Sequence, residues 1–335
     1  MITRTAPSWH TEDWQIQLIN SLTDLSELLT ILKLSPEDLP RQLQAQQSFP
    51  LRVPRQFVAR MLPKNPQDPL LLQVLPQPQE LMAAPGFSND PLQEQQFTPV
   101  PGLIHKYRSR VLLTTSSACA VNCRYCFRRH FPYQENRISQ QQISAIVHYL
   151  KQHPEVNEVI LSGGDPLATS NSRLKSLIDN LENLPQLTRI RVHTRFPVVI
   201  PQRIDQGLLD IIEHSRLRWI LVVHSNHSQE LGTEFQEVME PLKDKDVLLL
   251  NQSVLLKGVN DNVETLTALS ETLFAMGIQP YYLHLLDPVA GASHFHLEDV
   301  IARALYQRLL AALPGYLVPK LVRETPEAPA KTPVI

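Results

Sequence analysis

The segment Ser117-Ala-Cys-Ala-Val-Asn-Cys-Arg-Tyr-Cys-Phe-Arg-Arg-His130 decides how this chain is interpreted. It holds all 3 cysteines of the 335-residue sequence, Cys119, Cys123 and Cys126, in the order Cys-x3-Cys-x2-Cys. A disulfide needs two thiols and a closed zinc site needs four ligands, whereas three thiolates at this spacing can hold three irons of a four-iron cluster. The fourth iron would stay open to a substrate or cofactor. The alternatives are a zinc site completed by His130 and three buried cysteines that cluster by chance.

The composition favours an ordered globular protein. The sequence is 43% hydrophobic and 19% charged, which suits a chain with a sizeable core. Its 31 Lys and Arg against 33 Asp and Glu give a net charge of -2, so we expect no nucleic-acid partner. The stretch from Met1 to His10 has no apolar signal core, and no apolar run approaches the roughly 20 residues of a membrane span. We therefore expect a cytoplasmic protein without a membrane partner, in which thiols stay reduced.

Upstream of the cysteine segment, residues 1–104 are rich in proline and glutamine. This region holds 14 of the 28 prolines, which predicts short helices broken by turns rather than a sheet. We expect helices over Trp14 to Lys33 and over Pro54 to Met61. The stretch Asp68 to Pro76 could pack on the main domain as a short element, and the pattern assigns it no function.

From residue 110 onward, short apolar runs alternate with amphipathic helical stretches. This alternation is typical of βα units and a parallel sheet, so the predicted fold class is α/β. Six units fit between residues 110 and 313, too few for an eight-stranded barrel. The predicted strands are Val111 to Thr115, Glu158 to Leu161, Arg189 to His193, Trp219 to His224, Val247 to Gln252 and Pro280 to Leu285. The predicted helices are Gln140 to Gln152, Ser172 to Leu184, Asp205 to Ser215, Gln229 to Lys243, Val263 to Met276 and Leu297 to Leu313.

Polar residues gather where these strands end. Barrel-type sheets build their sites at this rim, so the coincidence favours one site made from six loops, although polar residues begin loops in any protein. His224 and His227 could be metal ligands, but hydrogen bonds within a pocket explain them better. The polar positions are the cysteine segment, Ser162-Gly-Gly-Asp165, His193-Thr-Arg195, His224-Ser-Asn-His227, Asn251-Gln252 and Asp287.

The loop Leu161-Ser-Gly-Gly-Asp-Pro-Leu167 offers two glycines, Gly163 and Gly164, that permit a ligand to approach the backbone closely. Carbonyl groups and the carboxylate of Asp165 could then meet an amino-acid ammonium. Alone, the motif fits any tight turn between a strand and a helix. Together with the cysteine segment, it favours a ligand-binding loop.

Together these segments resemble the lysine 2,3-aminomutase family of radical S-adenosylmethionine (SAM) enzymes, and the similarity runs through most of the chain. The length and ending are most similar to the bacterial branch that makes β-lysine for elongation factor P. The matching stretches are His105 to Arg110, Cys119 to Tyr133, Leu161 to Leu167, His193 to Pro201, Asn251 to Asp261 and Pro280 to Asp287.

The resemblance implies a partial (β/α)6 radical SAM barrel over residues 105–313. A mainly helical region, 1–104, would precede it, and a segment, 314–335, would close the site. The implied reaction moves the amino group of L-α-lysine to give β-lysine, started by a radical from SAM bound to a 4Fe-4S cluster. The cluster ligands would be Cys119, Cys123 and Cys126, and the SAM loop would be Gly163, Gly164 and Asp165.

Pyridoxal 5'-phosphate (PLP) is also implied, and it needs a lysine for its resting imine. The family pattern selects Lys331 as this catalytic residue, and Lys106 and Arg110 as ligands of the phosphate. By local sequence alone, Lys331 is a solvated tail residue and the other two form a solvated turn. The apolar stretch Gly315 to Val322 could dock as a strand and carry the tail over the barrel mouth.

A lysine substrate needs a cation for its carboxylate and an anion for its ε-ammonium, since burying either charge unpaired is costly. The resemblance assigns the carboxylate to Arg128, which can bind it in bidentate fashion, and the ammonium to Asp287 and Glu324. Lysine-specific relatives carry Asp where Glu324 stands, so this position departs from the pattern. The alternative is a plain surface basic patch made of Arg124, Arg128, Arg129 and His130.

Two further departures concern clostridial relatives. Asn262 stands where they place a zinc-binding cysteine, so no structural zinc is expected, and their oligomerising extension does not follow Lys331. The implied partners are lysine, an electron donor protein and, through a separate ligase, elongation factor P. Two alternatives stay open: a radical SAM and PLP enzyme for another amino acid, and a zinc-containing module in which arginines grip RNA.

Overall fold

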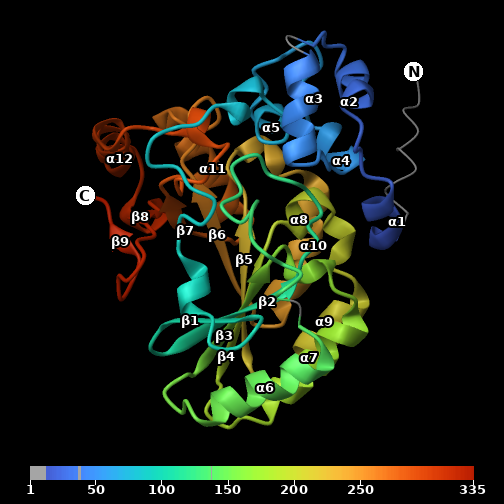
Figure 1. Ribbon diagram of the computed structural model, residues 1–335, viewed down its shortest axis with the longest axis vertical. Coiled ribbons are helices and arrows are strands. Elements are labelled where there is room, and N and C mark those ends of the chain that lie inside the picture. Colours follow the sequence, from blue (N-terminus) through green and yellow to red (C-terminus); the bar gives the residue numbers. More distant parts are fainter. Residues whose placement is uncertain (1–12, 37–38, 137) are drawn as a thin grey trace.

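The computed structural model describes residues 13–36, 39–136 and 138–335. Its centre is a nine-stranded sheet whose strands follow one another in chain order (Figure 1). Six neighbouring strands, β2 to β7, are parallel. They are β2 (Arg110–Ser116), β3 (Glu158–Gly163), β4 (Arg189–Thr194), β5 (Arg218–His224), β6 (Leu248–Val254) and β7 (Gln279–His284). The helices that follow them are α6 (Gln140–Lys151), α7 (Asn171–Glu182), α9 (Gln206–Glu213), α10 (Thr233–Asp244), α11 (Val263–Ala275) and α12 (Asp299–Ala312).

This is the predicted partial (β/α)6 barrel, and each of the six predicted strands is present within two residues at either end. The apolar runs form strands because helices cover them; β3, for example, is buried along its whole length. The largest shift concerns α10, which begins at Thr233 rather than Gln229 because a separate 3-10 turn, η6 (Ser228–Glu230), precedes it.

Side-chain caps fix where several of these helices begin. Ser139 and Asp205 accept hydrogen bonds from backbone amides in the first turns of α6 and α9, which is the usual role of such residues. Asn262 does the same for α11, accepting from the amide of Thr265 at 2.8 Å. Asn262 is therefore a helix cap in this chain.

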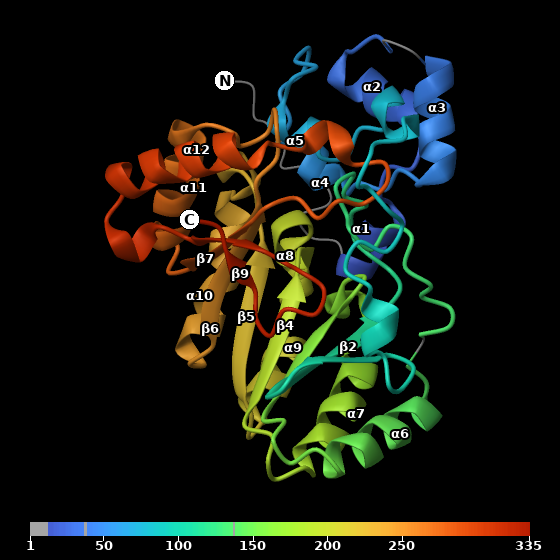
Figure 2. The same ribbon diagram turned by 60° about the vertical axis from the view of Figure 1, so that its left-hand side comes forward.

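Three strands at the sheet edges lie outside the six predicted units. β1 (Leu103–Tyr107) pairs antiparallel with β2, and the sequence pattern missed it. β8 (Lys320–Arg323) pairs parallel with β7 and carries β9 (Thr332–Pro333) antiparallel on its other side. The segment after α12 thus docks as a strand, as the apolar stretch ending at Val322 predicts, and the turn between β8 and β9 returns the chain toward the sheet (Figure 2).

The N-terminal region is helical, as predicted. Its helices are α1 (Trp14–Ile19), α2 (Leu25–Leu32), α3 (Leu39–Ser48), α4 (Arg55–Val58) and α5 (Pro69–Leu72). The single helix predicted over Trp14 to Lys33 is wrong, because Leu22 forms a bridge with Val53 and Asp24 caps a new helix. The helix predicted from Pro54 is confirmed in place but is shorter.

These N-terminal helices pack over the carboxyl ends of β4 and β5 (Figures 1 and 2). The guanidinium of Arg60 donates to the carbonyl of Val198, in the short helix α8 (Phe196–Val199) after β4, at 2.7 Å. It also donates to the carbonyl of Glu230, after β5, at 2.6 Å. The region thereby covers the end of the sheet where the polar loops lie.

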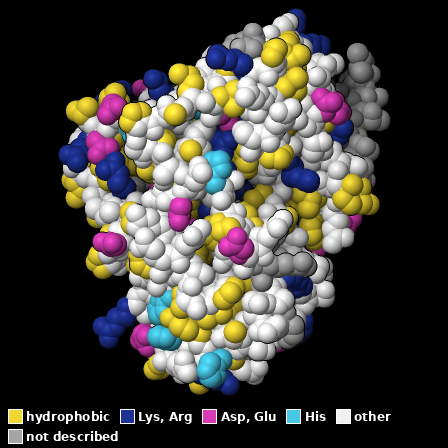
Figure 3. Space-filling model, viewed as in Figure 1, with side chains coloured by type: hydrophobic (Ala, Val, Ile, Leu, Met, Phe, Trp, Pro, Cys, Tyr) yellow, Lys and Arg dark blue, Asp and Glu magenta, His cyan; other side chains and the backbone are white. Residues whose placement is uncertain are grey.

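The surface carries no large field of one charge on the face drawn in Figure 3, where Lys and Arg lie among Asp and Glu. Among the described helices, none has the length and apolar character needed to cross a membrane. The segment Met1 to His10, in which no signal peptide is expected, lies outside the described residues.

Candidate active site

A cavity of about 700 Å³ lies at the carboxyl ends of the parallel strands, where barrel sheets build their sites. It brings together residues that lie more than 200 positions apart in the chain and that sequence reasoning selected one motif at a time. The selected residues in its lining are Lys106, Arg110, Cys119, Cys123, Cys126, Arg128, Gly163, Gly164, Asp165, Asp287, Glu324 and Lys331.

The cysteine loop, residues 117–130 between β2 and α6, is anchored by the N-terminal region. Arg124 is fully buried, and its guanidinium binds both carboxylate oxygens of Glu80, at 2.8 and 2.5 Å. Arg129 binds the same carboxylate at 2.9 Å, and His130 Nε2 lies 3.2 Å from the carbonyl of Ala290. Arg124 and Arg129 are thus buried anchors, and the interpretation of these arginines as a surface basic patch is wrong.

For two of the three thiols, Cys119 and Cys126, the surroundings disfavour a free thiolate in the absence of a metal. Burial, reinforced by the charge of the neighbouring thiols, raises the pKa of Cys119 well above its usual range and that of Cys126 to about 11. A bound metal ion deprotonates a coordinating thiol outright and supplies the compensating charge. Three clustered cysteines beside a cavity fit a cluster that keeps one iron open.

The glycine loop after β3 lies directly against the cysteine loop. Gly163 has φ of +108°, which side chains rarely adopt, and a Cβ on Gly164 would lie 2.5 Å from the carbonyl oxygen of Ala118. The amide of Gly164 donates to Ser116 and that of Asp165 donates to Ala118, both at 2.8 Å. The two glycines are required for this close contact between the loops.

Asp165 holds the ends of two strands together. One carboxylate oxygen accepts from the amide of Leu167 and the hydroxyl of Thr194, at 3.0 and 2.7 Å. The other accepts from the amides of Arg195 and Phe196, at 2.8 and 3.1 Å. Because these four bonds use the usual acceptor capacity of a carboxylate, the structure gives Asp165 a positioning role in the glycine loop.

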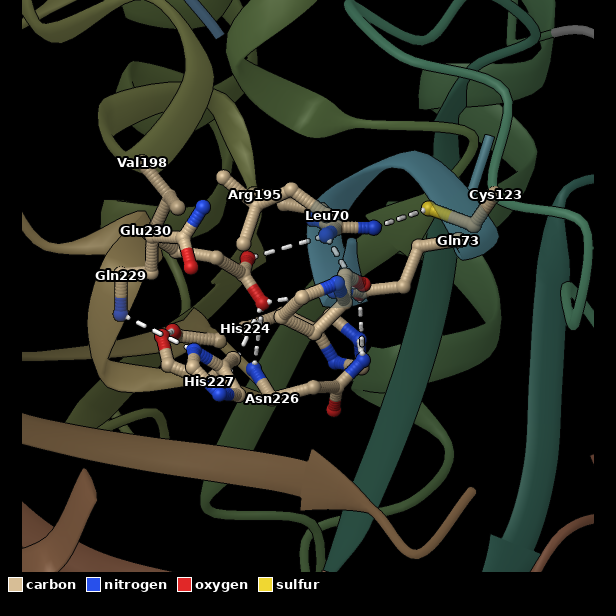
Figure 4. A network of polar contacts seen from close by, with 12 residues as sticks. Leu70, Gln73, Cys123, Arg195, Val198, His224, Asn226, His227, Gln229 and Glu230 are labelled. Atoms are coloured by element: carbon tan, nitrogen blue, oxygen red, sulfur yellow. Dashed lines mark hydrogen bonds and ion pairs between the residues drawn. The ribbon is translucent and has the colours of Figure 1, made fainter. Parts of the chain in front are cut away.

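A buried polar network lies beside Cys123 (Figure 4). The sequence pattern marked Arg195 and the segment 224–227 as polar positions but predicted none of their contacts. The guanidinium of Arg195 contacts Cys123 Sγ at 2.7 Å, the Gln73 side-chain oxygen at 2.7 Å and Glu230 at 2.9 Å. Tyr125 OH lies 2.7 Å from the same guanidinium. Gln73 belongs to the stretch Asp68 to Pro76, to which the sequence pattern assigned no function, and its side chain takes part in this network.

The tail residue Lys331 reaches the cavity from the turn between β8 and β9. Its Nζ binds Glu324 at 2.6 Å, and Lys106 Nζ binds the other oxygen of the same carboxylate at 2.7 Å. Tyr107 OH donates to Glu324 as well. Burial acts to raise the pKa of Glu324, but the two lysines and the tyrosine outweigh it and lower that pKa to about 2. Glu324 is therefore a charged bridge between two lysines.

Asp287 stands in contrast to Glu324. Burial raises its pKa to about 7, with Lys331 acting in the opposite direction, and no described residue donates a hydrogen bond to its carboxylate. In the same cavity lining, the guanidinium carbon of Arg110 lies 4.2 Å from the centre of the Tyr107 ring. A half-buried acid that lines a cavity without a hydrogen-bond partner is the kind of group that a cationic ligand would satisfy.

Arg128 lines the cavity but is already engaged. Its guanidinium binds both carboxylate oxygens of Glu94, at 2.8 and 2.6 Å, and its Nη1 donates to the Ser162 hydroxyl at 3.0 Å. Glu94 lies in the 3-10 helix η3 (Glu94–Phe97), and nothing in the sequence pattern pointed to it. The carboxylate that the arginine binds in this structure belongs to the protein itself.

Two histidines near the end of β5, His224 and His227, form hydrogen bonds. His224 Nε2 lies 2.8 Å from Tyr125 OH, and burial lowers the pKa of His224 to about 3. His227 accepts from the amide of Gln229 and caps η6. His193 Nε2 is buried without a hydrogen-bond partner in the described part of the chain, so the cavity offers a further polar atom to a ligand.

The fold and this site define a radical SAM enzyme, and residues 113–222 match the Radical SAM superfamily. L-lysine 2,3-aminomutase of Escherichia coli (strain K12) is 48% identical over 100% of this chain and 97% of its own length. The Haemophilus influenzae protein of that name is also 48% identical, over 96% of this chain and 95% of its own, and the Clostridium subterminale protein is 34% identical over 96% and 78%. The chain belongs to the lysine 2,3-aminomutase family.

Among solved structures, a radical SAM methyltransferase from Sphaerobacter thermophilus has 17% sequence identity and a TM-score of 0.46, over 66% of this chain and 68% of that chain. Family membership makes the protein an enzyme of the isomerase class and brings three cofactors: a 4Fe-4S cluster, SAM and PLP. The alternative of a zinc-containing RNA-binding module is thereby set aside.

Proposed function

We propose that this protein converts L-α-lysine to β-lysine in the cavity between the cysteine loop and the tail. The observation that carries the proposal is Asp287, a half-buried carboxylate that faces the same cavity as the cysteines and Lys331 and has no hydrogen-bond partner among the described residues. A primary ammonium at the far end of a substrate would pair with it. Substrate binding would then relieve the cost of this half-buried group.

The tail group, which we define as Lys106, Arg110, Asp287, Glu324 and Lys331, supports separate roles for its two acids. Glu324 is taken by the two lysines at 2.7 and 2.6 Å, so we propose that Asp287 is the main partner of the ε-ammonium. Glu324 instead holds Lys331 and Lys106 in place. This division would allow Glu to stand at a position where lysine-specific relatives carry Asp.

The residues present fit the three cofactors. We propose that Cys119, Cys123 and Cys126 hold the cluster, and that Gly163 and Gly164 shape the backbone next to SAM. Lys331 would hold PLP while Lys106 and Arg110 meet its phosphate; with Arg110 over the Tyr107 ring, both cations face the cavity. When bound, SAM on the reduced cluster supplies a hydrogen-abstracting radical and PLP supplies an electron sink.

Arg128 needs one change to bind a substrate carboxylate. Its guanidinium faces the cavity but both of its forked donors rest on Glu94. We propose that the substrate carboxylate takes over part of this fork, since a bidentate carboxylate is what the geometry already accommodates. Ser162, which accepts from Nη1 at 3.0 Å, would keep the guanidinium in the cavity during the exchange.

We also propose that residues 105–313 form the catalytic core, that 1–104 covers it and that 314–335 closes it. An electron donor protein would reduce the cluster. The product would serve elongation factor P through a separate ligase. Release of free β-lysine and its use by a ligase and elongation factor P in a coupled assay would test this link.

The direct test is an anaerobic assay with SAM, PLP, a reductant and L-lysine. Wild type should form β-lysine, and Lys331→Ala should abolish it. Lys320→Ala, an exposed lysine in β8, is the matched control and should retain activity. Product formation by Lys331→Ala would refute the PLP assignment, and no product from wild type with a full cluster would refute lysine as substrate.

A second candidate keeps the chemistry but changes the amino acid. The acids of the tail group favour a substrate with a cationic side chain, because Asp287 and Glu324 would repel an acidic one such as glutamate. Arginine is the closest competitor, since its guanidinium is also a cation. Competition between L-lysine, L-arginine and L-glutamate in the same assay separates these cases.

A further inference from the structure

The contact between Arg195 and Cys123 has no role in the function proposed so far. Arg195 Nη1 lies 2.7 Å from Cys123 Sγ, and the arginine side chain is only 6% exposed. Among the hydrogen bonds of the described residues, this one alone joins a cationic side chain to a cysteine sulfur. The buried positive charge therefore lies next to one particular thiol of the cysteine loop (Figure 4).

Arg195 is held in this position from several sides. Its backbone amide donates to Asp165 at 2.8 Å, which fixes the start of the loop after β4. Its Nη2 donates to Glu230 at 2.9 Å and to the Gln73 side-chain oxygen at 2.7 Å. These partners leave Nη1 directed at Cys123 and Tyr125 OH. Such a fixed geometry is what a residue that acts on a neighbouring ligand requires.

Glu230 balances the charge of Arg195 and is itself fully buried. Its other oxygen accepts from the amides of Asn226 and His227, at 2.9 and 3.1 Å, and from Gln73 at 3.1 Å. The carboxylate is thus fixed beside the guanidinium. The electric field at Cys123 depends on both groups. The positive guanidinium of Arg195 contacts the sulfur, whereas the negative carboxylate of Glu230 contacts the guanidinium and not the sulfur.

We propose that Arg195 is a positioning residue that orients Cys123 and makes the iron-sulfur cluster easier to reduce, while Glu230 limits this effect. Reduction adds one electron from an external donor to the cluster. A hydrogen bond and a positive charge at a cluster sulfur stabilise the added negative charge, and both are known determinants of cluster potential. The inference rests on the proposed cluster at the cysteine loop.

The experiment is a redox titration of the SAM-free 4Fe-4S protein, followed by the electron paramagnetic resonance signal of the reduced cluster. For Arg195→Gln we expect a more negative midpoint potential, with at least tenfold less reduced relative to oxidised cluster at a fixed potential, which is about 59 mV for a one-electron couple. Arg195→Lys keeps the charge and should shift less. Glu230→Gln should shift the potential the other way.

Arg189→Gln is the charge-matched control. It removes one positive charge from the other end of β4, roughly 20 Å away at about 3.3 Å per residue, where Arg189 pairs with Glu158. Its potential should equal that of wild type. A general effect of net charge would shift this variant as well.

The outcomes are distinguishable. Opposite shifts of the midpoint potential in Arg195→Gln and Glu230→Gln support the inference. If the two residues were merely structural, their substitution would lower the cluster content without moving the potential in opposite directions. Unchanged potentials, or shifts of one sign, overturn it. Should Arg195→Gln fail to load iron, the other two variants decide. A less negative potential in Glu230→Gln with a slightly more negative one in Arg195→Lys supports the inference, and unchanged potentials or shifts of one sign overturn it. Wild type without iron would instead refute the proposed function.

Discussion

The two ends of the cavity satisfy their buried polar groups in different ways. At the cysteine end, Asp165, Arg195 and Glu230 each have several protein partners, so that end is set before any ligand arrives. At the tail end, Asp287 has no partner among the described residues, and its pKa is raised by burial. One end is thus preorganised for a permanent centre, and the other is left for a substrate to complete.

The largest expected effects separate the two ends completely. Cys126→Ser should lose iron and all activity yet still bind PLP at Lys331, because its change lies at the cysteine end. Lys331→Ala should show the reverse, with full iron and no PLP imine. Iron analysis and borohydride reduction of both variants check this. Loss of both cofactors in either variant would mean that the ends are not independent.

The next effect concerns the unpaired acid. Asp287→Asn should lower kcat/KM for L-lysine at least a hundredfold, since breaking a buried ion pair costs about 3 kcal/mol or more. Steady-state assays measure it, with Asp246→Asn as the control, because the Asp246 side chain is 87% exposed. An Asp287→Asn enzyme with normal kcat/KM would remove Asp287 from substrate recognition.

The same substitution should stabilise the ligand-free protein. The pKa of Asp287 rises to about 7 in the folded chain from about 3.9 when unfolded. Between those values the folded state holds a proton that the unfolded state has lost, so wild-type stability falls as pH rises through this window, by up to about 4 kcal/mol. Asp287→Asn should not lose stability in this way, because asparagine does not ionise.

Thermal unfolding at pH 5 and pH 8 checks the sign. The melting temperature of Asp287→Asn should exceed that of wild type at pH 8, and the difference should shrink at pH 5. If the difference in melting temperature is the same at both pH values, ionisation of Asp287 does not destabilise the folded protein.

The smallest effect is expected for Glu324→Asp. The shorter side chain cannot bridge Lys106 and Lys331 as Glu324 does, but it keeps the charge. We expect a change of only a few-fold in KM for lysine, because Asp287 remains the main partner of the ammonium. A hundredfold change in this variant, measured beside Asp287→Asn, would reverse the roles of the two acids.

Local sequence patterns predicted the core of the fold, because each of its strands can be recognised from its own residues. Most of the six strands are short apolar runs, while β4 alternates polar and apolar residues, and the bounds of all six agree within two residues. β1 was missed because His105 and Lys106 interrupt its apolar character. The helix predicted over Trp14 to Lys33 was split by the pairing of Leu22 with Val53, a contact that depends on distant sequence.

The site shows the same division. Motifs and family resemblance selected residues that all line one cavity, yet their partners could not be predicted. Glu94 meets Arg128 across 34 positions and Arg195 meets Cys123 across 72, and neither pairing leaves a local pattern. Sequence named the groups with chemistry, while the groups that position them required the fold.

The most direct test of the central claim is one anaerobic absorption spectrum of the reconstituted wild-type protein, recorded before and after borohydride. We predict iron-sulfur absorption from the cysteine end together with a PLP imine band that borohydride removes, both in the same sample. A colourless protein without iron, or a spectrum with no reducible imine, would contradict a single cavity that holds both centres.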